Sequence, residues 1–174
     1  MTRFARISLA ALLMLSGCGY TQVGDDPSSG YQWRSLYRED VKTVAVNIFQ
    51  NKDYTRGVEF VLTKAIVNQL EAHSPYKVVP QDRADTVLEG QINTVRRSTI
   101  SKDSVTALPQ EQLYVIDLDF TWKDLRTGRI LVERRNFEQT TTYYPTLGEG
   151  QSIGNQQAAE RLALAIVQEL QADW

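Results

Sequence analysis

The sequence predicts an α+β fold, a two-layer sandwich in which two helices pack on one face of a four-stranded, mostly antiparallel or mixed sheet. Three observations predict it. Four segments alternate apolar and polar residues, as strands with one buried face do. Two other segments repeat apolar residues with a period of about 3.6, as amphipathic helices do. The order along the chain is strand, helix, three strands, helix (β-α-β-β-β-α).

The first strand and the first helix lie between residues 41 and 73. The strand spans Val41–Ile48, with Val44, Val46 and Ile48 expected on one face. The helix spans about residues 56–73, and Ser74-Pro75 ends it because proline cannot continue the hydrogen-bond ladder. Its apolar stripe comprises Val58, Val61, Leu62, Ala65, Ile66 and Leu70.

Three strands and a helix follow. The strands are predicted at about 86–98, 113–123 and 130–142, and Leu125–Arg129 predicts a hairpin turn between the last two. Poor alternation in the last strand predicts a bulge or a two-sided environment. Residues 98–112 are expected to form the longest interior loop. The second helix, at about 155–171, carries a stripe of Ala159, Leu162, Ala163, Ile166 and Leu170. The second face of the sheet is polar and is expected to face water or a partner.

The first eighteen residues predict export and lipidation. Arg3 and Arg6 precede an apolar run from Ile7 to Leu15, and Leu15-Ser16-Gly17-Cys18 resembles a bacterial lipobox. The run is about half of the roughly 20 residues that a spanning helix needs. We therefore expect a signal peptide at 1–17, acylated Cys18 at the mature start, a lipidated tether over 18–40, and one domain over 41–174. The alternative is a hydrophobic helix with an incidental cysteine.

Composition excludes several function classes. Removing residues 1–17 takes away Arg3 and Arg6 and no acidic residue, so the net charge goes from −2 to −4. A nucleic-acid-binding domain would be strongly basic, so no nucleic acid is expected as a partner. Cys18 is the only cysteine in the chain, which removes intramolecular disulfides and cysteine-based metal sites.

The sequence holds no recognisable catalytic constellation. The single histidine, His73, lies at a predicted helix end, where such a residue is ordinary. Asp117 and Asp119 lie two apart on one strand face, and they form either paired carboxylates or a solvated face. There is no glycine-rich phosphate loop and no nucleophile in an elbow. We expect no enzyme activity, no metal and no cofactor.

Four arginines are candidate ligands for a phosphorylated head group. Arg96 and Arg97 end the second predicted strand, and Arg134 and Arg135 lie on the fourth. If these strands are neighbours, the cations could gather near one end, and the planar fork of arginine suits phosphate. The alternative is protection of a strand edge against aggregation.

The order of several motifs resembles the lipopolysaccharide-assembly lipoprotein family LptE. Following the lipobox and Cys18-Gly19-Tyr20, the motifs are Val44–Asn51, Arg56-Gly57-Val58-Glu59 at the start of a helix, Ala84–Ile92, and Gln157–Ala163. The resemblance covers nearly the whole mature chain. It implies two helices on a four-stranded sheet, in agreement with the order above.

The resemblance also implies a function. LptE-like proteins are outer-membrane lipoproteins that plug the lumen of the β-barrel LptD, help it to assemble, and contact lipopolysaccharide during delivery to the outer leaflet. Basic residues on strands and loops are the family's lipopolysaccharide contacts, and Arg96, Arg97, Arg134 and Arg135 occupy comparable positions. The resemblance places the protein on the periplasmic side of the outer membrane, held by its lipid. The alternative is a periplasm-facing lipoprotein that acts as a scaffold or pilot subunit of another envelope complex.

Overall fold

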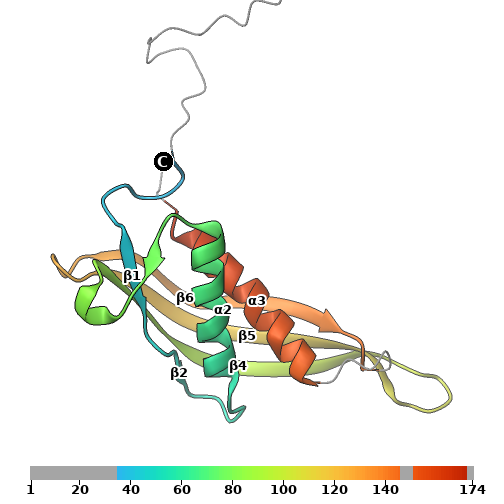
Figure 1. Ribbon diagram of the computed structural model, residues 1–174. Helices are drawn as coiled ribbons and strands as arrows, with labels where there is room; N and C mark the ends of the chain where they lie inside the picture. The colour runs from blue at the N-terminus through green and yellow to red at the C-terminus, as the bar shows by residue number, and fades with distance from the viewer. Residues whose placement is uncertain (1–34, 146–150, 172–174) are drawn as a thin grey trace, which may run out of the picture. The chain divides into compact units, whose positions relative to one another are not determined.

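The computed structural model describes residues 35–145 and 151–171 of the chain, which lie in one unit. Two helices cover one face of a mixed sheet (Figure 1). The strands are β1 (Thr43–Val46), β2 (Gln50–Asn51), β3 (Lys77–Val78), β4 (Thr86–Lys102), β5 (Pro109–Asp124) and β6 (Ile130–Tyr143). The helices are α2 (Val58–His73) and α3 (Gln151–Glu169), and a short 3-10 turn, η1, spans Gln81–Arg83.

The sheet has a parallel part and an antiparallel part. Its strand order is β3-β1-β4-β5-β6, with β2 also paired to β4. Strand β1 runs parallel to β3 and β4, and β2 runs parallel to β4. The long strands β4, β5 and β6 are joined by antiparallel hairpins. The predicted α+β class and mixed sheet are confirmed, and the described sheet has two more strands than the four predicted. Both additional strands, β2 and β3, are two residues long, which is too short for sequence alternation to reveal.

Both helices bury the stripes that their periodicity predicts. The buried residues of α2 include Val58, Leu62, Ile66 and Leu70, whereas Val61, predicted in the same stripe, is partly exposed. The helix begins after Gly57, whose φ of 90° is accessible to glycine at little cost. It ends at Ser74, as predicted, where the Ser74 N–H donates to the carbonyl oxygen of Leu70. All five residues of the predicted second stripe, Ala159, Leu162, Ala163, Ile166 and Leu170, are buried.

The first strand is shorter than predicted, and a shift in pairing follows it. Val46 is opposite Leu88, whereas Gln50 is opposite Gln91, so the first segment contains one extra residue. An extra residue reverses the alternation of side chains. Ile48, expected on the core face, is therefore 61% exposed, and Phe49 is buried in its place.

Residues 98–112 form a hairpin where a loop was predicted. Ser98 to Lys102 continue β4, and Pro109 to Gln112 begin β5, leaving Asp103–Leu108 as the connection. The ladder reaches Lys102 opposite Pro109, with two irregularities at Ser101. The alternation of residue types is weak here because both faces are exposed, so periodicity gave no strand signal.

The last residues of the predicted tether pack on the domain. The ring of Tyr37 lies edge-on to Tyr76 at 5.6 Å between centroids, and Tyr76 lies at the same distance from Trp122. The Tyr37 hydroxyl donates to the carbonyl oxygen of His73, and the Arg38 N–H donates to the Tyr76 hydroxyl. Residues 35–40 are thus ordered against the end of α2.

Candidate functional site

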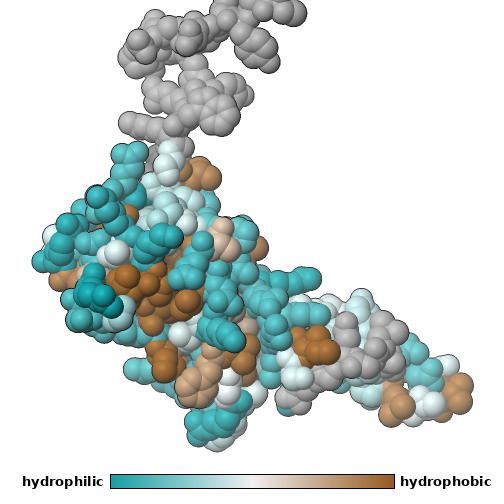
Figure 2. Space-filling view, in the orientation of Figure 1, coloured by the Kyte–Doolittle hydropathy of each residue, from teal (hydrophilic) through white to brown (hydrophobic). Residues whose placement is uncertain are grey.

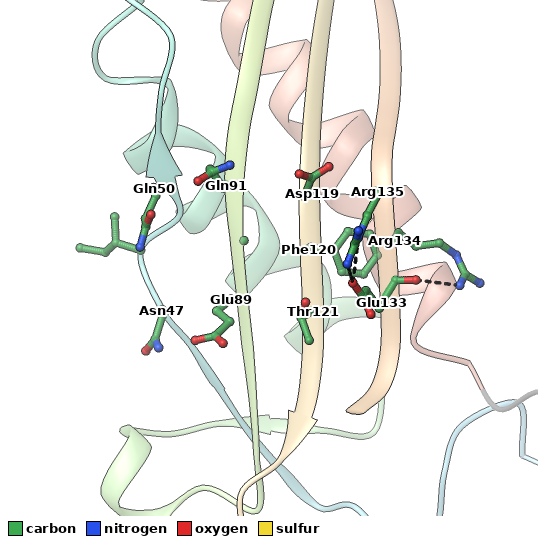
Figure 3. Close-up of a pocket in the computed structure, with 12 residues that line it drawn as sticks. Asn47, Gln50, Glu89, Gln91, Asp119, Phe120, Thr121, Glu133, Arg134 and Arg135 are labelled. Atoms are coloured by element: carbon green, nitrogen blue, oxygen red, sulfur yellow. Dashed lines mark hydrogen bonds and ion pairs between the residues drawn. The ribbon is translucent and has the colours of Figure 1, made fainter. Parts of the chain in front are cut away.

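The face of the sheet opposite the helices is polar and open. Every second side chain of β4 and β5 points toward the helices and is buried there; these include Leu88, Ile92, Leu118, Phe120 and Trp122. We call the face that points away from the helices the helix-free face. Its polar members on β4, β5 and β6 are Glu89, Gln91, Arg96, Asp117, Asp119, Thr121, Glu133, Arg135 and Glu138. Figure 3 shows the central ones standing on the sheet, with the helices behind it.

A shallow hollow of about 400 Å³ lies on this face. Its floor is formed by two residue pairs of the β4–β5 ladder, Gln91 with Asp119 and Glu89 with Thr121. Asn47 and Gln50 flank one side, and Glu133 and Arg135 flank the other (Figure 3). Carboxylates, amides and the guanidinium group of Arg135 face the hollow, so it suits a hydrogen-bonding surface.

Bulges on both sides of β5 shape this face. One lies in β4, where Ile92 pairs with Leu118 but Thr94 pairs with Asp117. The other lies in β6, between Arg134 and Phe137, which confirms the predicted irregularity of that strand. Asn136 in this second bulge has a φ of 51°, a left-handed conformation that asparagine tolerates. The two bulges increase the local twist and bend the long strands at one level.

Asp119 joins the sheet to the second bulge. Its Oδ1 accepts a 2.8 Å hydrogen bond from the N–H of Asn136. That bond holds the pKa of the Asp119 carboxyl below its usual value, so the group is charged at neutral pH. The neighbouring Asp117 accepts a longer bond, 3.4 Å, from the Asn93 amide. The two carboxylates therefore belong to a polar, bulge-stabilising network, which favours the interpretation as a solvated face over paired catalytic acids.

The four candidate arginines do not gather at one place. Arg96 and Arg135 lie on the helix-free face, where they pair with Glu138 at 2.6 Å and Glu133 at 2.8 Å. Arg134 points to the helix side, and its Nε lies 2.7 Å from Glu169 Oε2 at the end of α3. Arg97 is exposed opposite buried Tyr114.

Among these four side chains, Arg97 alone makes no ion pair with the residues at 35–145 and 151–171. Contact of any of the four with lipopolysaccharide stays a prediction.

The remaining candidate residues make structural contacts or lie outside the described residues. His73 is the last residue of α2, and its carbonyl oxygen accepts the Tyr37 hydroxyl. Within the described ranges no group of three or more His, Cys, Asp or Glu side chains could hold a metal ion, and no helix is long and apolar enough to cross a membrane. Cys18 and the predicted signal peptide lie outside the described residues.

Sequence reasoning missed Asp53, which connects the start of α2 to the bulge in β4. One carboxylate oxygen accepts the N–H of Thr55 at 2.8 Å, and the other accepts the N–H of Val95 at 3.2 Å. Asn51 completes the turn by accepting the N–H of Asp53 at 2.9 Å. The Asn51-Lys52-Asp53 sequence predicts a turn, but the partner across the sheet depends on a bulge that no local pattern shows.

Solved structures share this fold at low sequence identity. The PelC dodecamer from Paraburkholderia phytofirmans aligns with a TM-score of 0.54 and 20% identity, covering 78% of this chain and 93% of that one. Uncharacterized lipoprotein B from Nitrosomonas europaea aligns with a TM-score of 0.52 and 11% identity, covering 83% and 92%. A minor lipoprotein from Acinetobacter baumannii aligns with a TM-score of 0.50 and 16% identity, covering 75% and 93%. These likenesses establish the fold alone.

The family is established by sequence. No protein of curated function matches the chain. The model of the family LptE, described as lipopolysaccharide-assembly, matches residues 41–173, which include every described helix and strand. The chain belongs to the LptE lipopolysaccharide-assembly family.

Proposed function

We propose that this protein is an outer-membrane lipoprotein that plugs an LptD-type β-barrel, helps it to assemble and takes part in delivering lipopolysaccharide to the outer leaflet. Membership of the LptE family supports the assignment to lipopolysaccharide assembly. The role is one of binding and positioning, without catalysis.

The observation that carries the plug is the open, hydrogen-bonding face of the sheet. Two-layer folds bury one face of the sheet under helices, and a partner or water covers the other. Here that other face presents charged and amide side chains around a shallow hollow. The interior of a large membrane barrel is polar, so a domain seated there needs such a surface.

Acylation of Cys18 supplies the membrane attachment in this proposal. A single acyl chain holds a protein only marginally, whereas several chains anchor it durably. Residues 19–34 separate Cys18 from the described domain. An extended chain spans about 3.3–3.6 Å per residue, so this length allows the domain to reach a neighbouring barrel while anchored.

Co-purification with matched charge reversals tests the plug. Glu89→Lys reverses a charge on the helix-free face, at an exposed side chain that makes no ion pair with the described residues. Glu71→Lys makes the same change at an exposed position on α2. We expect the wild type and Glu71→Lys to retrieve a large outer-membrane barrel in equimolar amount, and Glu89→Lys to retrieve less.

Two results would contradict the proposal. Equal retrieval by both variants would remove the helix-free face from the interface. Retrieval of a secretin ring or of peptidoglycan, with no large barrel, would instead support the scaffold or pilot alternative.

A further inference from the structure

Five exposed cations of the described chain lie along one end of the sheet, which we call the basal edge. Strands β1, β3, β4 and β6 begin at this edge and β5 ends there, opposite the β4–β5 hairpin (Figure 1). Each cation lies at or close to one of these strand ends; they are Lys42, Lys77, Arg83, Arg126 and Arg129. Figure 2 shows mostly hydrophilic residues at this end of the molecule. The whole chain has a net charge of −2, so this concentration of positive charge is local.

Hydrogen bonds between neighbouring strand ends bring these positions side by side. The Lys77 N–H donates to the carbonyl oxygen of Lys42 at 3.0 Å, and the Lys42 N–H donates to Asp85 Oδ2 at 3.2 Å. The N–H of Leu125, beside Arg126, donates to the carbonyl oxygen of Asp85 at 2.9 Å. The cations therefore form a row that runs across the edge of the sheet from β3 to the turn between β5 and β6.

The carboxylates of the basal edge do not neutralise this row. Asp85 accepts two backbone N–H groups and a hydroxyl, and Asp124 accepts two backbone N–H groups of its own turn. The exposed carboxylates here are fewer than the cations; among the described residues they are Glu39, Asp40 and Asp82. Apart from a 3.8 Å contact between Arg126 and Asp124, the five cations make no ion pair with the described residues. Their charge is thus available to an anionic ligand.

A hollow of about 420 Å³ at this edge contains a guanidinium group with an unfilled hydrogen bond. Arg38, Lys42 and Lys77 line the hollow, and Glu39 is the carboxylate of its lining. Arg38 Nε is buried and has no hydrogen-bond acceptor among the described residues. A buried donor without a partner costs free energy, and a phosphate oxygen is a strong acceptor for a guanidinium N–H. The hollow therefore suits a phosphate group.

Chain connectivity places the basal edge next to the membrane anchor of the proposed function. Residues 35–42 lead into β1, and residues 19–34 separate them from Cys18. A surface on a short tether meets its ligand at a high effective concentration, so a weak contact suffices. Three exposed aliphatic side chains accompany the cations: Leu36 is 48% exposed, Leu125 is 36% exposed and Ile130 is 51% exposed. A head-group layer receives such side chains together with long cationic ones.

We propose that the basal edge binds the phosphate groups of anionic phospholipids in the leaflet that holds the Cys18 anchor, an inference that rests on the lipid anchor of the proposed function. A row of long, flexible cations suits a membrane surface, because each gains from the negative surface potential without needing a fixed geometry. The contact keeps this end of the anchored domain at the level of the head groups.

Vesicle binding without the anchor tests the basal edge by itself. The parent is the whole chain from residue 18, carrying Cys18→Ser so that its own lipid does not contribute. The edge variant adds Lys42→Gln, Lys77→Gln and Arg129→Gln. The matched control instead adds Lys52→Gln, Lys64→Gln and Arg161→Gln, which remove the same charges from exposed positions outside the basal edge. Circular dichroism and thermal unfolding check that each variant keeps the fold.

Sedimentation with vesicles at low salt measures the affinities. We expect the parent and the control to bind vesicles that contain phosphatidylglycerol. The edge variant should bind them at least about tenfold more weakly, because each cation near an anionic surface strengthens binding several-fold. Vesicles of phosphatidylcholine alone should bind none of the three proteins, and added salt should weaken binding by screening. In the acylated protein, the edge substitutions should leave retrieval of the barrel unchanged.

Other results overturn the proposal in distinguishable ways. If the parent does not bind anionic vesicles, or if the control loses as much binding as the edge variant, the membrane contact is wrong and the proposed function is unaffected. Equal, edge-dependent binding to deacylated lipopolysaccharide would identify a soluble sugar phosphate as the ligand and overturn the assignment to phospholipid. Loss of barrel retrieval by the acylated edge variant, with unchanged vesicle binding, would identify a protein contact and overturn it as well.

Failure of the proposed function gives a different result. If the acylated wild type retrieves no barrel while binding to anionic vesicles still depends on the edge cations, the barrel plug is contradicted and the membrane contact is supported.

Discussion

The aromatic ring of Phe49 lies directly against Gly90, and the two residues leave no space for a side chain between β2 and the core face of β4. A Cβ placed on Gly90 would lie 2.6 Å from the carbonyl oxygen of Asp119 and still closer to the Phe49 ring. Phe49 reaches this position because the extra residue before β2 turns it inward. The Asn47-to-Gln50 side of the hollow therefore depends on a glycine in the neighbouring strand.

Gly90→Ala is expected to destabilise the domain. The added methyl group must displace a buried ring or a strand backbone, and overpacking of this kind costs about 1–3 kcal/mol of unfolding free energy. Denaturant unfolding measures the difference. Ser98→Ala, at an exposed position on the same strand, is the control and should change stability by less than about 0.5 kcal/mol. Equal stability of both variants would show that the ring moves freely.

The stability of the domain is expected to fall in acid through Asp85. The Thr43 hydroxyl donates to Asp85 Oδ2 at 2.9 Å, and with the N–H groups of Lys42 and Thr43 it lowers the pKa of this carboxyl. A lowered folded-state pKa contributes stability that is present above the unfolded value, about 3.9, and is lost as the pH falls through the folded value.

Asp85→Asn tests this dependence. The variant should be less stable than the wild type at pH 7, because one accepting oxygen is replaced by an amide group. Its unfolding free energy should then decline less steeply below about pH 4, since the titrating group is gone. Parallel wild-type and variant curves of unfolding free energy against pH would assign the acid sensitivity to other carboxyls.

Arg97→Gln is expected to weaken lipopolysaccharide binding more than Arg135→Gln does. Arg135 is held by Glu133 through two bonds, at 2.9 and 2.8 Å, and must give up that carboxylate to bind phosphate. Arg97 makes no ion pair with the described residues, so its charge is available to a ligand. Binding titrations at low and moderate salt measure both affinities, and the ranking should hold at each. The reverse ranking would place the phosphate contact on the helix-free face.

Cys18→Ala is expected to abolish acylation and to leave the barrel contact as the attachment to the membrane fraction. In the proposed function the acyl chains are attached at Cys18, so the alanine variant should carry none. Fractionation after carbonate extraction, with metabolic labelling by a fatty acid, measures both anchoring and acylation. Incorporation of label into the alanine variant would show that another residue is modified.

The sequence predicts the regular parts of this fold well because both helices and the long strands bury one face. The apolar stripes of α2 and α3 and the alternation of apolar and polar residues in β5 follow directly from that burial. The sequence predicts poorly the places where the pairing register of two strands changes. The exposed Ile48 and the buried Phe49 exchange roles because of one extra residue, and the signal for that residue lies in the pairing with β4.

The candidate site likewise has features that the sequence predicts and features that it does not. The polar character of the helix-free face follows from Asp117, Asp119 and Thr121, which alternate with buried residues. The separation of Arg134 from Arg135 also follows from alternation. The ion pairs do not, because Glu169 is 35 residues from Arg134 and meets it only when α3 packs on the sheet. Asp53 and Val95 are likewise 42 residues apart.

The parallel pairing of β4 ends at Ile92, beside its bulge, and this limit divides β4 into a part that is paired on both sides and a part that is paired with β5. Up to Ile92, β4 is paired with β1 and β2 on one side and with β5 on the other, and α2 packs on this part of the sheet. Beyond it, β4 is an edge, and its backbone amides have hydrogen-bond partners mainly on β5. Amides of residues 94–102 should therefore exchange with solvent through local openings of lower free energy than those of residues 86–92. The hairpin arm can then open and close while the base of the sheet stays folded.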